Sequence, residues 1–169
     1  MTDGLDRLNR LSPAEAEAEL LRCCGSTAWA RRVVAARPFA SEAALLAEAD
    51  AAWASASRDD VLEAFSRHPR IGEQKAEKPA AATGEWSRQE QAGVSDATDD
   101  VRRELAEGNA AYFDRFGYIF LVCATGKSAE EMLGLLRARL GNAPDDELRV
   151  AAEEQRKIMH IRLRKLLIA

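Results

Sequence analysis

One short run of residues constrains the fold class of this chain more than any other. The run from Tyr118 to Ala124 is the only segment with the β-branched and aromatic character of a β-strand. A lone strand has no partner with which to form a sheet. We therefore expect this run to be a buried extended or helical connector, and we expect the protein to be all-α.

Capping signals and apolar residues at spacings of three and four predict helices over most of the chain. The expected helices cover about 13–24, 26–37, 42–56, 59–66, 98–114, 128–140 and 144–168, and one more begins near Trp86. Residues 73–85 lack such a period and are expected to form a solvated loop. The result would be an irregular bundle of about 7–9 helices in a single domain that spans residues 1–169.

Charge and composition narrow the class of protein. The chain has 24 Lys and Arg against 28 Asp and Glu, interspersed along the sequence, so it lacks the basic stripe that nucleic-acid binding needs. No apolar stretch approaches the length of a membrane span, and the N-terminus has no apolar core of a signal peptide. We expect a soluble, cytoplasmic protein that binds neither nucleic acid nor membrane.

The spacing of the cysteines and histidines indicates whether disulfides or a metal site are to be expected. Cys23, Cys24 and Cys123 match neither a disulfide framework nor a CxxC site, so we expect three buried, reduced thiols. The two histidines lie far apart and have no cysteine cluster beside them. A zinc site is therefore not expected.

His68 is the strongest candidate for a chemical role. It follows a predicted helix and precedes Pro69, which disfavours the α conformation in the residue before it, while Gly72 lets the chain turn away. A stiff loop would then aim the imidazole. An ordinary histidine has a pKa of about 6.5, which suits general acid/base catalysis. The alternative is a histidine that caps the end of a helix.

The last predicted helix carries two polar residues on its apolar side. Leu148, Ala151, Ile158 and similar residues share one arc of the helix, and Gln155 and Arg162 fall inside that arc. A buried arginine must be paired with an anion. Arg162 would therefore form either a structural ion pair, for instance with Glu104 or Asp114, or a clamp for an anionic ligand.

Ser87 and Glu90 also allow two interpretations. In the first, they form a capping box at a helix N-terminus, with Trp86 as a hydrophobic staple. In the second, the same hydroxyl and carboxylate form a polar wall for a ligand, because the free N–H groups of a helix N-terminus attract anions.

Several motifs, taken in order, resemble one protein family. They are His68-Pro69-Arg70-Ile71-Gly72-Glu73, Trp86-Ser87-Arg88-Gln89-Glu90-Gln91, Asn109 and Tyr112 before Phe116-Gly117 and Phe120, Arg139-Leu140-Gly141-Asn142, Glu147, Ala151, Lys157-Ile158 and Arg162-Leu163. The ordered set resembles the 2-oxo-4-hydroxy-4-carboxy-5-ureidoimidazoline (OHCU) decarboxylases of urate breakdown, over roughly residues 11–167. The resemblance implies an all-helical, cofactor-free carboxy-lyase that yields (S)-allantoin from a small ureide, commonly as a homodimer.

The resemblance also assigns site residues by position. It implies that His68 is the catalytic histidine, Glu90 the active-site carboxylate and Arg162 the active-site arginine. It further implies ligand contacts from Ser87, from Gln91, from the carbonyl of Pro69, and from backbone groups of Phe120, Leu121, Val122, Cys123 and Ala124. Two alternatives stay open. One is another cofactor-free acid/base lyase or isomerase acting on a small ureide, and the other is a non-enzymatic helical interaction module.

Overall fold

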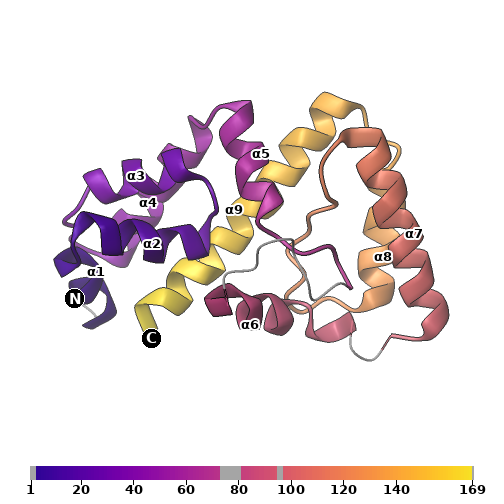
Figure 1. Cartoon of the computed structure of the whole chain (residues 1–169), viewed down its shortest axis with the longest axis horizontal. Helices are drawn as coiled ribbons and strands as arrows, with labels where there is room; N and C mark the ends of the chain where they lie inside the picture. The colour runs from indigo at the N-terminus through magenta and orange to yellow at the C-terminus, as the bar shows by residue number, and fades with distance from the viewer. Residues whose placement is uncertain (1–2, 73–80, 95–96, 169) are drawn as a thin grey trace. The chain divides into compact units, whose positions relative to one another are not determined.

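A computed structural model describes residues 3–72, 81–94 and 97–168, and within these ranges every regular element is a helix (Figure 1). The expected all-α class is confirmed. The elements are α1 (Asp3–Arg10), α2 (Pro13–Cys23), α3 (Thr27–Ala35), α4 (Glu42–Ala54), α5 (Arg58–Ser66), α6 (Ala81–Glu90), the 3₁₀ turn η1 (Ala92–Val94), α7 (Asp99–Phe116), α8 (Ala129–Arg139) and α9 (Pro144–Ile168). None of the described helices is both long and apolar enough to cross a membrane.

Side-chain caps explain where several helices begin. Ser12 accepts a hydrogen bond from the N–H of Glu15, and the Glu15 carboxylate accepts one from the N–H of Ser12. This pair is a capping box, which satisfies two N–H groups that have no acceptor within the helix. Ser128 caps α8 through the N–H of Glu131 at 3.1 Å. The sequence therefore encodes these boundaries locally.

Two helices differ from the prediction. Helix α1 was not predicted, because its buried Leu5 and Leu8 span too short a stretch to establish a period. Helix α6 begins at Ala81, so part of the predicted loop at 73–85 is helical, while residues 73–80 lie outside the described ranges. Alanine is the strongest helix former, and the one glycine in α6, Gly84, costs only about 1 kcal/mol.

The chain forms two compact units. The first comprises Met1–Ala64 with Arg156–Ala169, and the second comprises Phe65–Gln155, so α9 contributes its two halves to different units. The single domain proposed for residues 1–169 stays a prediction. In the first unit, Trp29 is fully buried and its Nε1 donates to the carbonyl of Ala49 at 3.0 Å. This bond satisfies the one polar atom of a large core side chain.

The core of the second unit is built around Tyr112. Its ring lies 4.6 Å from that of Phe116 and 5.5 Å from that of Phe120, measured between centroids. Helices α7 and α8 pack side by side (Figure 1), and a Cβ at Gly108 would come within 2.5 Å of Leu136. Only glycine allows this close approach without a shift of the leucine side chain.

The run from Tyr118 to Ala124 belongs to the same core. It is not helical and forms no strand with any described residue. Phe120, Leu121 and Val122 are each at most 3% exposed. The predicted buried connector is confirmed, and it is not helical.

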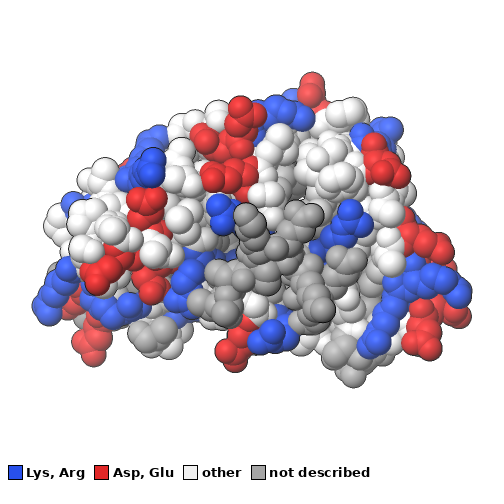
Figure 2. All heavy atoms as spheres, in the orientation of Figure 1, with Lys and Arg blue, Asp and Glu red and all other residues white. Residues whose placement is uncertain are grey.

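Charged side chains of both signs lie among one another on the face drawn in Figure 2. Ion pairs such as Arg31–Glu17 at 3.3 Å in the first unit and Arg137–Glu104 at 3.2 Å in the second are exposed. Pairs of this kind contribute little to stability because solvent screens them. The charge pattern therefore indicates an ordinary solvated surface over this face.

Candidate active site

His68 lies in a tight turn directly after α5. Its N–H donates to the carbonyl of Phe65 at 3.2 Å, and its side chain is buried at 9% exposure. The following loop is held by α7, because Nδ2 of Asn109 donates to the carbonyl of Ile71 at 2.9 Å. Gly72 has a φ of +88°, a conformation that favours glycine. The loop expected after His68 is therefore present: α7 holds it at Ile71, and it turns at Gly72.

One side chain from α9 contacts the imidazole. Nε2 of His68 lies 2.8 Å from Oε1 of Gln155, a residue with no exposed surface. Gln155 is one of the two polar residues that fall on the apolar arc of α9. A buried amide costs free energy unless it is hydrogen-bonded, and His68 supplies one of its bonds.

The C-terminal end of α6 also reaches the His68 loop. Oε1 of Gln91 accepts a hydrogen bond from the N–H of Gly72 at 3.1 Å. Glu90, the last residue of α6, is buried at 8% exposure. The predicted site residue Gln91 thus joins the end of α6 to the loop that carries His68, and Glu90 is the residue before it.

The predicted capping box at Ser87 is wrong. Ser87 lies inside α6, and its carbonyl accepts the N–H of Gln91 at 3.1 Å, as in the interior of a helix. An N-cap residue would instead precede the first helical turn. The helix N-terminus invoked for a ligand at Ser87 is therefore also absent from this position, and Ser87 projects from the last turns of α6.

The connector after α7 is anchored by charged side chains through its backbone. The N–H of Cys123 donates to Oε1 of Glu154 at 3.2 Å, and Nη1 of Arg139 donates to the carbonyl of Leu121 at 2.7 Å. Nζ of Lys127 donates to the carbonyl of Cys123 at 2.8 Å. Glu154 precedes Gln155, so neighbouring residues of α9 hold both the connector and the imidazole.

Two carboxylates act on the pKa of Cys123 in the connector. Burial raises the pKa of the Cys123 thiol, and the negative charges of Glu154 and Glu90 act in the same direction. Cys123 forms no disulfide and is buried, as predicted for all three cysteines.

Several backbone N–H groups of the connector have no hydrogen-bond acceptor among the described residues. Within the described ranges, this holds for Phe120, Leu121, Val122 and Ala124, although these residues are at most 4% exposed. Buried N–H groups in proteins are nearly always hydrogen-bonded. These groups are suited to bind the oxygens of a ligand.

A buried ion pair between Arg139 and Glu147 supports the connector. Nη2 and Nε of Arg139 lie 2.6 Å and 2.7 Å from Oε1 of Glu147, and the hydroxyl of Tyr112 donates to the same oxygen at 2.5 Å. Nδ2 of Asn142 donates to Oε2 of Glu147 at 2.9 Å. Burial raises the pKa of the Tyr112 hydroxyl, and its bond to Glu147 raises it further. In the sequence these residues stand out only as family motifs, and their pairing was not predicted.

Arg162 belongs to the first unit. Its side chain is 5% exposed, and Nη1 donates to the carbonyl of Arg22 at 3.1 Å. Burial raises the pKa of Cys24 to about 12, and the positive charge of Arg162 opposes this rise. The predicted burial of Arg162 is confirmed. Its role beside His68, like its alternative pairing with Glu104 or Asp114, stays a prediction.

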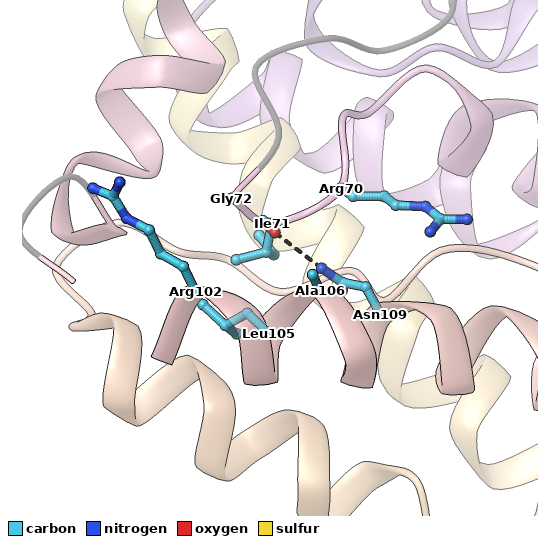
Figure 3. Close-up of a pocket in the computed structure, with 7 residues that line it drawn as sticks. All are labelled: Arg70, Ile71, Gly72, Arg102, Leu105, Ala106 and Asn109. Carbon is cyan, nitrogen blue, oxygen red and sulfur yellow. Dashed lines mark hydrogen bonds between the residues drawn. The ribbon is translucent and has the colours of Figure 1, made fainter. Parts of the chain in front are cut away.

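A cavity of about 90 Å³ lies beside the His68 loop (Figure 3). It is lined by Arg70, Ile71, Gly72, Arg102, Leu105, Ala106 and Asn109. Figure 3 shows Arg70 and Arg102 extending to opposite sides, so the two guanidinium groups do not converge on one ligand. The guanidinium of Arg70 lies 5.3 Å from the ring centroid of Phe113.

The described ranges contain no group of three or more His, Cys, Asp or Glu side chains arranged to hold a metal ion. The second unit contains the His68 imidazole, the Glu90 carboxylate and the connector. Comparison with known proteins identifies the family of the chain. Residues 9–164 match the sequence pattern of the family described as OHCU decarboxylase.

The chain belongs to the OHCU decarboxylase family. The uric acid degradation bifunctional protein TTL of Arabidopsis thaliana is 37% identical over 145 residues, which make up 85% of this chain and 45% of that protein. The 2-oxo-4-hydroxy-4-carboxy-5-ureidoimidazoline decarboxylase of Amia calva is 36% identical over 102 residues, or 59% of this chain and 57% of that protein. The chain thus spans about half the length of these two relatives.

Solved structures agree with the family assignment. A crystal structure of OHCU decarboxylase in the presence of (S)-allantoin has a TM-score of 0.77 and 35% identity, and the match covers 89% of this chain and 98% of that one. A crystal structure of (S)-allantoin synthase has a TM-score of 0.72 at 22% identity, which shows a common fold.

The site residues of the OHCU decarboxylase resemblance are divided between the two units. His68, Pro69, Ser87, Glu90, Gln91 and residues 120–124 belong to the second unit, and Arg162 belongs to the first. Sequence reasoning missed the contacts made by Gln155, Glu154 and Arg139. Gln155 carried a signal, because it interrupts an apolar arc.

Proposed function

We propose that this protein is a cofactor-free OHCU decarboxylase that converts OHCU to (S)-allantoin and CO₂. The observation that carries the proposal is the buried His68 imidazole, which is held by a hydrogen bond to the side-chain oxygen of Gln155, within the unit that also contains Glu90 and the connector. A buried, oriented imidazole is suited to proton transfer. Family membership supports the identity of the substrate.

The reaction breaks one carbon–carbon bond and forms one carbon–hydrogen bond. The carboxylate of OHCU leaves as CO₂, and the conjugated ring takes up the electron pair of the broken bond. The carbon that lost CO₂ becomes a carbonyl as its hydroxyl gives up a proton, and a proton adds to the neighbouring ring carbon that bears the ureido group. In this proposal His68 manages the proton of the substrate hydroxyl or delivers the proton to the ring carbon. Because the ring holds the electron pair, neither a metal nor a cofactor is required.

The other predicted residues bind and orient the substrate. The N–H groups of Phe120, Leu121, Val122 and Ala124 would hold substrate oxygens, and Glu90 would accept hydrogen bonds from ureido and imidazoline N–H groups. Arg162 would hold the anionic charge. Cys123 would contribute through groups other than its N–H, because Glu154 already accepts that bond.

Ser87, Gln91 and Pro69 complete the proposed substrate contacts. The Gln91 side-chain oxygen already accepts the N–H of Gly72, so Gln91 would offer its NH₂ group to the substrate. The carbonyl of Pro69 would accept a hydrogen bond beside His68. We further propose a cytoplasmic homodimer, which cell fractionation and light scattering would test.

The decisive experiment is the conversion of freshly generated OHCU in the presence of EDTA. OHCU decays spontaneously to racemic allantoin, so its disappearance alone does not demonstrate catalysis. A site that delivers the proton to one face must give one enantiomer. We expect the circular dichroism of (S)-allantoin to grow in proportion to enzyme concentration, with or without EDTA. Racemic product at the spontaneous rate, from protein shown to be folded, would reject the decarboxylase and favour another ureide lyase or an interaction module.

A further inference from the structure

Gln155 is a polar residue in a place where the helix pattern calls for an apolar one. It lies on the apolar arc of α9, has no exposed surface, and contacts a residue 87 positions away in the sequence. Within the described ranges, its Nε2 is buried and has no hydrogen-bond partner. A buried glutamine that served only stability would have hydrogen bonds at both its side-chain oxygen and its NH₂ group. The NH₂ group without a partner therefore points to a different role for this residue.

We propose that Gln155 is a positioning residue that keeps the neutral His68 ring in the tautomer protonated at Nε2. The inference rests on the proposed acid/base role of His68. Oε1 of Gln155 lies 2.8 Å from Nε2 and accepts its proton in a hydrogen bond. The nitrogen that gains and loses a proton during the reaction is then Nδ1.

The orientation of the amide follows from the needs of an acid/base histidine. Such a ring must exist in both its neutral and its protonated form. An oxygen acceptor keeps its bond to Nε2–H in both forms, whereas an NH₂ donor would lose its bond when Nε2 became protonated. Gln155 therefore presents its oxygen to the ring and leaves its NH₂ group unpaired.

The location of Gln155 suits this role. The preceding residue, Glu154, holds the N–H of Cys123, and Glu147 on the same helix pairs with Arg139, which holds the carbonyl of Leu121. One rigid helix thus fixes the imidazole relative to the connector whose N–H groups are proposed to bind the substrate. Sites supported by regular elements hold their geometry more closely than sites on loops.

Nuclear magnetic resonance tests the tautomer without any substrate. The chain contains only two histidines, so a ¹⁵N-histidine spectrum can be assigned with a His160→Gln variant. We expect neutral His68 to be protonated at Nε2 in the wild type. In Gln155→Met, which keeps the length of the side chain and removes the acceptor, the spectrum should shift towards a tautomer mixture. An Nδ1-protonated His68 in the folded wild type would overturn the proposal.

Kinetics test the consequence for catalysis. Gln155→Met should lower kcat by roughly 10- to 100-fold, the scale found when a hydrogen-bond partner of a functional histidine is lost, and KM should stay within about two-fold. Gln155→Glu, which keeps the acceptor oxygen, should retain more activity than Gln155→Met. Gln89→Met is the matched control, because it makes the same substitution at an exposed position and should leave kcat unchanged.

The outcomes separate this inference from the proposed function. Wild-type protein that fails to decarboxylate OHCU rejects the function, while the tautomer spectrum still tests the Gln155 contact. Active wild type with unchanged kcat in folded Gln155→Met rejects the positioning role. If Gln155→Met fails to fold, the wild-type tautomer and the activity of Gln155→Glu decide: an Nδ1-protonated ring or an inactive folded Glu variant overturns the inference.

Discussion

The guanidinium of Arg139 bridges Glu147 and the carbonyl of Leu121. Its Nη2 and Nε lie within 2.7 Å of one Glu147 oxygen, and its Nη1 donates to Leu121 at 2.7 Å. Its Cζ also lies 4.6 Å from the ring centroid of Phe120. The Arg139–Glu147 ion pair therefore supports the connector and also belongs to the core of the second unit.

Loss of Arg139 should destabilise the protein strongly. Arg139→Met leaves the Glu147 carboxylate buried without its cation, which should cost about 3–5 kcal/mol in the free energy of unfolding. Urea denaturation measures this value. The double variant Arg139→Met/Glu147→Leu removes both charges and should recover much of the loss. A single variant that costs less than about 1 kcal/mol would show that the pair is not effectively buried.

His68 should be required for turnover but not for folding. His68→Asn keeps a polar side chain in the turn and should lower turnover by roughly 10²–10⁴-fold, the usual contribution of a positioned acid or base. The circular dichroism of (S)-allantoin measures the rate, and thermal unfolding checks the fold. Turnover close to that of the wild type would remove His68 from the mechanism.

Glu90 should act through its charge. Glu90→Gln keeps the size of the side chain, so we expect a large loss of activity with little change in melting temperature. The exposed Glu85→Gln, on the same helix, is the matched control and should keep full activity. If Glu90→Gln melts early and turns over normally, the carboxylate serves stability instead.

Ser87 should contribute little as a helix cap. Because Ser87 lies inside α6, Ser87→Ala should cost less than the roughly 1 kcal/mol that a lost N-cap costs. Ser128→Ala, at a true N-cap, should show that full cost. A substrate contact predicts a higher KM for Ser87→Ala alone. Equal losses of stability in the two variants would contradict the interior position of Ser87.

Arg162 should affect substrate binding more than stability. Arg162→Met removes the bond to the carbonyl of Arg22, worth about 0.5–1.5 kcal/mol, and should raise KM for OHCU. Arg37→Met is the control, because Arg37 also donates to backbone carbonyls of the first unit, those of Leu8 and Leu11. An unchanged KM in Arg162→Met would exclude Arg162 from the site.

Much of the fold could be predicted because its signals are local. A capping box such as Ser12 with Glu15 involves residues three positions apart, so the sequence shows it directly. The run from Tyr118 to Ala124 was recognisable as a connector because the sequence offers no second strand-like run to pair with it. The ordered motifs around His68 and Glu90 likewise sufficed to predict the family.

The tertiary structure alone decided which polar side chains meet. The sequence placed Gln155 on an apolar arc but did not show that its partner is His68, 87 positions away. Arg139 was visible only as a family motif, and its pairing with Glu147 depends on how α8 and α9 pack. The start of α6 was misjudged because Ser87 and Glu90 fit a capping pattern that the preceding helical residues override. Hydrogen bonds between residues far apart in the sequence depend on how the helices pack, and no local sequence pattern encodes that packing. For this reason the contact between His68 and Gln155 could be found only in the tertiary structure.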